Sequence, residues 1–417
     1  MKPRFFEEVG RHPVLLSMSA DFLLSLAAVA LSTGAMQLFL YPQMALKLGP
    51  VEYGEVLTVV GVVNVVTLSL GNNLTSSRLV RQHVYEDSGE AGDFQALLVV
   101  SSVASVGIVA VYCALSGMAL AEGVAVAVFA LTTVLKSYYL VAFRIVIDYR
   151  KNLVANVFLC VGYVVGAFFL LGLFSWPWSF TLANIACIAY VMKASRIAFE
   201  PFRITRHFRS TFKSYSYLVG GGLLGNLSTY LDRFIVNPIL GVASVSTYTV
   251  ATFFPKGLSL ALAPLAGVLL SYVSQGRISF DKRKFILVNV AILVFCFVLL
   301  AFSVTLGRWI TQFFYPTIYD EAEPYIALAA VGVALGIGNS YNGTVVLAVA
   351  APVWQTVIPA ASLAIYFGLS VALASSIGLW GVCYASVASN ALRFFVNLAL
   401  GFWAIGKREA PVEEQLC

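Results

Sequence analysis

Residues 285–306 read FILVNVAILVFCFVLLAFSVTL, a run of 22 residues without a single charged side chain. A helix of this length rises about 33 Å, enough to cross the roughly 30 Å hydrocarbon core of a bilayer. Similar runs recur along the 417 residues, which are 60% hydrophobic and only 11% charged. The mean hydropathy is +0.87. No soluble globular class has this balance, so the sequence predicts an all-α, polytopic membrane protein.

Twelve apolar runs follow one another along the chain, and we interpret each as a membrane-spanning helix. The first is too long for the apolar core of a signal peptide and is interpreted as a retained span. The runs are Phe22–Leu46, Val56–Leu74, Phe94–Leu115, Gly123–Phe143, Leu153–Phe174, Trp176–Met192, Tyr217–Ile239, Val245–Val273, Phe285–Leu306, Tyr325–Ala350, Val353–Ala374 and Leu379–Ile405.

Lysine and arginine are distributed unequally between the two sides of the predicted membrane. Twenty of the 26 fall on one side, only Lys47 and Arg308 fall on the other, and four lie within apolar runs. Because cytoplasmic loops carry the excess of Lys and Arg, we expect both termini and the loop Lys193–Lys213 to be cytoplasmic. The net charge of +6 is then a topology signal. Basic residues spread over separate segments do not predict nucleic-acid binding.

The longest basic loop divides the chain nearly in half. We predict an N-terminal six-helix bundle over residues 1–192 and a basic cytoplasmic linker over 193–214. A C-terminal six-helix bundle with a short cytoplasmic tail follows over 215–417. Because each half has an even number of spans, both enter the membrane in the same orientation, as parallel repeats do.

Four cations lie where spanning helices would cross the middle of the bilayer: Lys136, Arg233, Lys256 and Arg393. An uncompensated cation at that depth costs ~2.5–3.5 kcal/mol on the insertion scale. Lipid cannot solvate these groups, so we expect them to face a shared polar cavity, and a cationic cavity favours an anionic cargo. For Arg233 a structural pair with another helix is the open alternative.

Asparagines accompany the embedded cations. Asn390, Arg393 and Asn397 are spaced by three and four residues, which places them on one face of a helix. Asn342 lies in the glycine-broken run Gly336–Gly343. We expect Asn342, Asn390 and Asn397 to donate and accept hydrogen bonds with cargo hydroxyls, the alternative being routine contacts between helices.

Asp232 is the only acid clearly inside a span. A carboxylate that alternates between pairing with a cation and binding a proton would form a two-state switch, so we predict a coupling role for Asp232. The alternative is a static ion pair. In the same span, Gly221 and Gly225 form a GxxxG spacing, which predicts a tight helix contact, with a hinge as the alternative.

The aromatic residues near position 315 favour an interfacial belt, with sugar stacking as the alternative. They are Phe313, Phe314, Tyr315, Tyr319 and Tyr325.

Sequence features of an enzyme are missing. There is no GxxxxGK[ST] or HExxH run, and no large hydrophilic loop carries clustered catalytic side chains. The three histidines lie in basic connecting segments, and none of the six cysteines forms a CxxC pair. We therefore predict no enzymatic activity, no metal site and no cofactor.

Each half of the chain contains a Leu-Gly dipeptide, at residues 48–49 and 240–241, and the residues around both resemble a known family. Residues 48–54, LGPVEYG, resemble the LGxxxYG signature of polysaccharide exporters in the multidrug/oligosaccharidyl-lipid/polysaccharide (MOP) flippase superfamily. Asp232-Arg233 followed by Leu240-Gly241, Tyr248 and Ala251 resembles the D-R…LG…Y..A pattern of that family. Thr247 stands where the family pattern has a glycine. The residues 313–315, FFY, and Asn342 are also similar, and the sequence most resembles Wzx-type O-antigen flippases.

This resemblance implies two six-helix bundles around a central cavity that opens alternately to each side. It implies transport of an undecaprenyl-pyrophosphate-linked oligosaccharide from the cytoplasmic to the outer leaflet of a bacterial inner membrane. Membrane lipids are then partners, while proton or sodium coupling and contacts with the pathway's polymerase and glycosyltransferases stay open. Two alternatives remain: a multidrug or toxin exporter of the same superfamily, and a membrane polysaccharide polymerase or glycosyltransferase.

Overall fold

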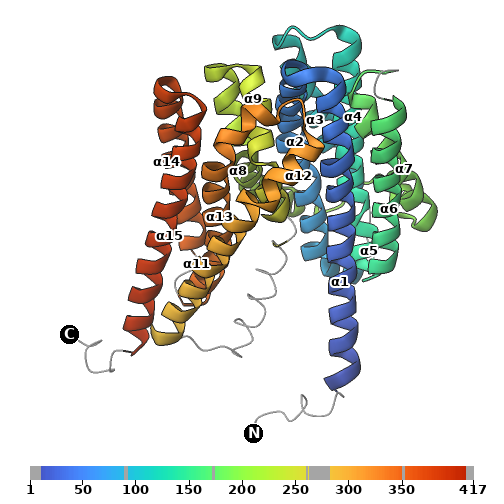
Figure 1. The fold of residues 1–417 in the computed structure, drawn as a ribbon. Helices are drawn as coiled ribbons and strands as arrows, with labels where there is room; N and C mark the ends of the chain where they lie inside the picture. The colour runs from blue at the N-terminus through green and yellow to red at the C-terminus, as the bar shows by residue number, and fades with distance from the viewer. Residues whose placement is uncertain are drawn as a thin grey trace. The chain divides into compact units, whose positions relative to one another are not determined.

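The computed structural model describes residues 11–88, 93–170, 174–259, 262, 282–349 and 353–409, which are helical over most of their length and contain no β-strand (Figure 1). In the first half the helices are α1 (Arg11–Ala35), η1 (Met36–Leu40), α2 (Tyr41–Ser88), α3 (Asp93–Leu115), α4 (Leu120–Tyr139), α5 (Val141–Ile145), α6 (Tyr149–Val165), η2 (Gly166–Leu170), α7 (Pro177–Ala194) and η3 (Ile197–Phe199). In the second half they are α8 (Phe208–Leu240), α9 (Val242–Ala251), α11 (Lys282–Val304), α12 (Leu306–Phe314), α13 (Tyr319–Val349), α14 (Trp354–Ile377) and α15 (Leu379–Glu409).

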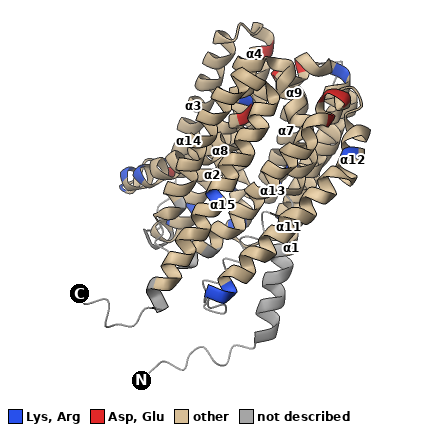
Figure 2. Cartoon of the chain, turned by 60° about the vertical axis from the view of Figure 1, so that its left-hand side comes forward, with Lys and Arg blue, Asp and Glu red and all other residues tan. Residues whose placement is uncertain are grey.

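Eight of the described helices are long and apolar enough to cross a membrane, one of them covering both of the first two predicted runs. Charged side chains are scarce along these helices (Figure 2). Large apolar side chains are instead exposed, as at Leu287 and Phe297 of α11, which are 69% and 71% exposed. The predicted all-α, multi-pass membrane architecture is confirmed. Part of the eighth predicted run, Val245–Val273, lies outside the described residues.

Contacts between helices divide the chain into two compact units. Unit 1 comprises Met1–Gln43 and Val63–Leu223, and unit 2 comprises Met44–Val62 and Leu224–Cys417. In unit 1, α1, α6, α7, α4 and α3 pack in sequence. Their small residues allow close approach, since a Cβ added to Gly162 of α6 would lie 2.4 Å from Cα of Ala183 on α7. The predicted domain boundaries stay a prediction.

In unit 2, α13 and α15 pack along each other, with α14 against α15 and α11 against α13. Two glycines with positive φ interrupt helices in this unit, Gly49 within α2 and Gly241 between α8 and α9. Gly49 has φ 78° and ψ 174°, and Gly241 has φ 85° and ψ 169°. This conformation is accessible essentially to glycine alone. Both predicted LG dipeptides therefore end a helix with the same backbone geometry, which is what a repeat predicts.

The helical path is interrupted a few residues before Lys256. Helix α9 ends at Ala251, Thr252 forms a turn, and helix resumes at Phe253. Pro255 lacks the N–H that would bond to the Ala251 carbonyl, and its ring clashes with that group, so the turn preceding proline opens. Lys256 therefore lies in the helical segment that follows this break.

Two expectations from the sequence are wrong. Gly221 and Gly225 make no tight helix contact with the described residues, because a Cβ added at either would meet no atom of theirs within 4 Å. The tightly packed glycine of this segment is Gly222, whose added Cβ would lie 1.9 Å from Nδ2 of Asn73. Tyr315 does not belong to an interfacial belt. It is 1% exposed and packs on Phe253, with ring centroids 4.9 Å apart.

Candidate functional site

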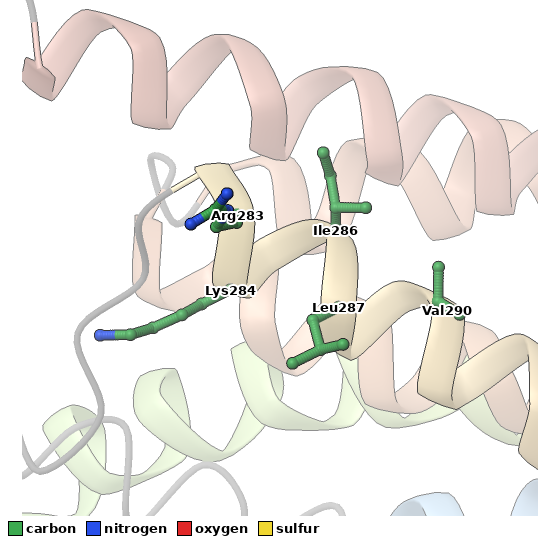
Figure 3. Close-up of a pocket in the computed structure, with 5 residues that line it drawn as sticks. All are labelled: Arg283, Lys284, Ile286, Leu287 and Val290. Carbon is green, nitrogen blue, oxygen red and sulfur yellow. The ribbon is translucent and has the colours of Figure 1, made fainter.

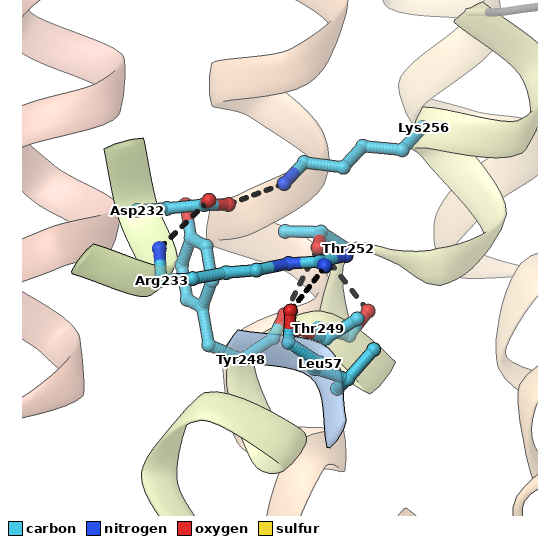
Figure 4. Close-up of polar contacts among 7 residues, drawn as sticks. All are labelled: Leu57, Asp232, Arg233, Tyr248, Thr249, Thr252 and Lys256. Atoms are coloured by element: carbon cyan, nitrogen blue, oxygen red, sulfur yellow. Dashed lines mark hydrogen bonds and ion pairs between the residues drawn. The ribbon is translucent and has the colours of Figure 1, made fainter. Parts of the chain in front are cut away.

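Asp232 and Lys256 form an ion pair in the interior of unit 2 (Figure 4). The side chain of Asp232 is only 8% exposed, whereas that of Lys256 is 39% exposed. The other carboxylate oxygen accepts the backbone N–H of Arg233 at 2.9 Å. Asp232 lies on α8 and Lys256 follows the break after α9, so two separate segments bring opposite charges together. The embedded acid is thereby neutralised by an embedded cation.

Arg233 forms no salt bridge with the carboxylate next to it in sequence, as expected for adjacent residues of a helix. Its Nη1 donates to the carbonyl of Leu57 on α2 at 2.7 Å (Figure 4). The guanidinium also lies over the ring of Tyr230, 5.2 Å from its centroid. A carbonyl and an aromatic face both stabilise a cation. Arg233 therefore ties α8 to the segment of α2 that belongs to unit 2.

Two tyrosines complete the surroundings of the ion pair, and sequence reasoning missed both of their roles. The ammonium of Lys256 lies 5.5 Å from the ring centroid of Tyr248 on α9. Tyr248 hydrogen-bonds through its side chain with Tyr366 on α14, and both phenols interact with the Asp232 carboxylate. Tyr366 lies in an apolar run, so its hydroxyl was visible as a polar group, but nothing local indicated its partner.

Lys136 and Arg393 differ from Lys256. Neither pairs with a carboxylate of the described residues. Lys136 is half-buried on α4 in unit 1, near the thiol of Cys187. Arg393 is half-buried on α15 in unit 2, and its buried Nε has no hydrogen-bond partner in the described part of the chain. Within the described residues, two of the four predicted cations thus have protein partners, and the other two have no carboxylate beside them.

The predicted asparagines lie on α13 and α15 in unit 2. Asn390 is half-buried, and its carbonyl accepts a hydrogen bond of 2.8 Å from Nδ2 of Asn339. Asn342 is completely buried, yet neither its Nδ2 nor its Oδ1 has a partner among the described residues. Asn397 is 3% exposed. A buried amide without partners costs roughly 1–3 kcal/mol per group.

A further asparagine, Asn289 of α11, joins this group. Ile292 and Cys296 of α11 pack on Gly338 of α13, and Phe285 packs on Gly401 of α15. Gly336 of α13 in turn faces Asn390 of α15.

These contacts fix how α11, α13 and α15 are aligned along one another. Counting one or two helical turns from them places Asn289, Asn342 and Asn397 at the same level of the three packed helices. Asn289 is 3% exposed, and its Oδ1 has no partner in the described part of the chain. Its signal was present in the sequence, because it is the only amide in the run 285–306. We call Asn289, Asn342 and Asn397 the asparagine cluster.

Unit 1 contains a polar network that the sequence did not predict. Arg78 of α2 forms two hydrogen bonds of 2.6 Å with Glu200 and one of 2.9 Å with the hydroxyl of Tyr138. Asp93, fully buried at the start of α3, accepts from both the backbone N–H and the hydroxyl of Thr205. The segment between α7 and α8 is therefore fastened to α2 and α3. Its partners are far apart in sequence, so no local pattern indicated them.

One pocket of roughly 520 Å³ lies along the start of α11 (Figure 3). Its described lining combines two cations with three apolar side chains, namely Arg283, Lys284, Ile286, Leu287 and Val290. None of the predicted site residues contributes to it. This pocket therefore adds nothing to the assignment of the cargo site.

Solved structures share this fold at low sequence identity. No protein-family model matches the sequence, and no curated protein matches it. Among solved structures, an inward-facing multidrug resistance MATE family transporter of the MOP superfamily is similar, with a TM-score of 0.66, 13% identity, and coverage of 95% of this chain and 99% of that one. The lipid II flippase MurJ in an inward closed conformation is also similar, with a TM-score of 0.64, 13% identity, and coverage of 97% and 89%. The Vibrio cholerae MATE transporter VcmN in the bent form gives a TM-score of 0.55 at 13% identity and covers 94% and 98%.

The fold is that of multi-pass helical membrane proteins, and the similar solved structures share it at low sequence identity. More particularly, the chain has the fold of MOP superfamily transporters, and the predicted twelve-helix, two-bundle layout fits that fold. These neighbours are transporters and flippases.

Proposed function

We propose that this protein is a flippase for an undecaprenyl-pyrophosphate-linked oligosaccharide, moving it from the cytoplasmic to the outer leaflet by alternating access for cell-surface polysaccharide assembly. The observation that carries the proposal is the lack of a carboxylate partner for Lys136 and Arg393 in the described part of the chain. A membrane-embedded cation is costly without a counter-charge. A pyrophosphate headgroup supplies that charge while it is bound.

Within this proposal, the four cations have different tasks. Lys136 and Arg393 bind the headgroup, whereas Arg233 is held by the Leu57 carbonyl and supports α8. The Asp232–Lys256 pair is the coupling element, because protonation of Asp232 would release Lys256 to bind the cargo anion. Asn342, Asn390 and Asn397 form hydrogen bonds with sugar hydroxyls, and Asn289 extends this set.

Export of drugs is the alternative that the solved structures fit equally well, since MATE transporters are among the similar proteins. Charge separates the two functions. A cationic drug requires an uncompensated acid, and Asp232 is already neutralised by Lys256. Lipid-linked cargo also agrees with the similarity to MurJ, which is a lipid II flippase.

Reconstituted vesicles test the proposal. Lipid-linked oligosaccharide is placed in one leaflet, and its arrival in the other is measured with a sugar-cleaving enzyme that cannot cross the membrane. We expect flipping of the pyrophosphate-linked oligosaccharide, and loss of flipping in Lys136→Gln and Arg393→Gln. The matched control is Arg308→Gln, which removes a half-buried cation paired with Glu323 at 3.4 Å. Transport of a cationic dye without any flipping would favour the drug exporter instead.

A further inference from the structure

Helix α12 (Leu306–Phe314) is a short helix between two long ones. It follows α11 after Thr305, whose φ of −92° and ψ of −81° interrupt the helical path. Helix α11 is 23 residues long and has no charged side chain after Lys284, so it is long and apolar enough to use the full thickness of the hydrocarbon core. The chain therefore enters α12 at a membrane boundary. Nine residues rise only about 13 Å, too little to cross the bilayer again.

Side chains divide α12 into three arcs when it is wound at about 100° per residue. The first arc faces the protein. Gly307 and Thr311 are buried, and a Cβ added to Gly307 would lie 2.7 Å from the ring of Phe254. Phe314 extends this arc toward Phe253, with ring centroids 6.2 Å apart. One side of α12 is thus fixed on unit 2.

The second arc is apolar and exposed. Leu306, Trp309 and Phe313 are 44%, 68% and 71% exposed, and the half-buried Ile310 lies beside Leu306 at the edge of this arc on the wheel. This surface continues directly from α11, where Phe302 is 51% exposed. Because α11 is a membrane-spanning helix, an apolar side chain exposed near its end, such as Phe302, faces lipid, and the same environment extends to α12.

The third arc is polar. Arg308 forms an ion pair with Glu323 on α13, with Nη1 and Oε1 3.4 Å apart, and Gln312 is exposed. On the wheel, Arg308 and Gln312 are separated from the centre of the apolar arc by roughly 130°. A helix with distinct protein, lipid and water faces meets all three only when it lies along the surface of a bilayer.

We propose that α12 is an interfacial helix that lies in the plane of the membrane and binds the lipid leaflet through Leu306, Trp309, Ile310 and Phe313. The partner is the lipid surface itself, with Trp309 at the depth that tryptophan prefers. On the predicted topology this is the outer leaflet. The inference does not depend on the cargo, since it rests only on exposure and helix geometry.

Spin labels on single engineered cysteines test this placement in vesicles, with reactive native cysteines replaced by serine. Trp309→Cys and Phe313→Cys probe the apolar arc, and Gln312→Cys is the matched control on the polar arc. Oxygen concentrates in hydrocarbon, whereas a nickel chelate stays in water. We expect oxygen to dominate relaxation at positions 309 and 313 and nickel to dominate at 312. Nickel dominance at all three positions would place α12 in water and overturn the proposal.

Exclusion of both reagents at 309 and 313 would also overturn it, because it would mean that a protein or a second copy covers this face. A second measurement needs no cysteine variant. Quenching of tryptophan fluorescence by lipids brominated near the headgroup is compared between the unchanged protein and Trp309→Phe. We expect the variant to lose a lipid-quenched component, and equal quenching of both proteins would contradict the placement.

Discussion

Gly54 of α2 packs directly on the backbone of Val242 at the start of α9, so that a Cβ added to Gly54 would lie 2.0 Å from the Val242 carbonyl oxygen. Atoms of a folded protein do not approach so closely, and a backbone carbonyl cannot rotate away as a side chain can. Residues 48–54 therefore combine a positive-φ glycine, a buried tyrosine and a glycine at a close contact. Within unit 2, the backbone conformation at Gly49 and the close contact at Gly54 explain why residues 48–54 have glycine at these two positions.

Gly54→Ala is expected to destabilise the protein by about 1–3 kcal/mol, the usual cost of overpacking. The measurement is the melting temperature in detergent, with the fraction of monodisperse protein as a second readout. Gly107→Ala is the matched control, because Gly107 lies in α3 and its added Cβ would meet no atom within 4 Å. The control should melt at the same temperature or higher. Equal melting of both variants would contradict the close contact.

Gly49→Ala and Gly241→Ala should each cost about 1–3 kcal/mol, since both positions have a backbone conformation that side chains with a Cβ rarely adopt. Neither added Cβ would meet an atom within 4 Å, so the cost comes from the backbone and not from packing. Melting temperatures of the two single variants test this. Similar losses support the structural repeat, and an unaffected variant would show that its glycine is not required.

Neutral substitutions of the cations should have opposite effects on stability. Lys136→Gln and Arg393→Gln remove charges that have no carboxylate partner among the described residues, so stability should stay unchanged or rise. Lys256→Gln leaves Asp232 without its cation and should cost about 1–3 kcal/mol, between the values for exposed and buried ion pairs. Thermal melts check all three variants. Marked destabilisation by Lys136→Gln or Arg393→Gln would indicate structural roles and remove the main support for a cargo site.

Asp232→Asn preserves the shape of the side chain and removes its charge. If Asp232 couples transport to an ion gradient, the variant should flip cargo at a rate that no longer responds to an imposed proton or sodium gradient. The double variant Asp232→Asn/Lys256→Gln removes both charges and separates coupling from folding, because no unpaired charge remains. Flipping with an unchanged gradient dependence in Asp232→Asn would rule out the coupling role.

Asp93→Ala should release the segment between α7 and α8. The substitution removes the acceptor for the Thr205 backbone N–H and for the hydroxyls of Thr205 and Tyr85. Each orphaned group costs roughly 1–3 kcal/mol if it stays buried, so the segment is expected to detach. Trypsin then cleaves faster at Arg196, Arg203 or Arg206. Asp148→Ala, which changes an exposed helix cap, is the control and should leave cleavage there unchanged.

Much of the fold was readable because its signals are local. Hydropathy along each run, such as 285–306, identifies a membrane span without knowledge of its neighbours. The depth of Lys136 or Arg393 within a run follows from counting residues, and the LG dipeptides at 48–49 and 240–241 indicated the helix breaks that Gly49 and Gly241 make. These features depend only on nearby residues and on the fixed geometry of a helix.

Only the tertiary structure decided which embedded charges are compensated. Lys256 pairs with Asp232 and Arg233 with the Leu57 carbonyl, whereas Arg393 meets no carboxylate of the described residues. The rotation and offset of one helix against another determine such contacts, and these depend on packing between segments far apart in sequence. The alignment of Asn289 with the asparagines of α13 and α15 also depends on how these helices pack. Nothing within a single helix indicates that the three residues lie at the same level.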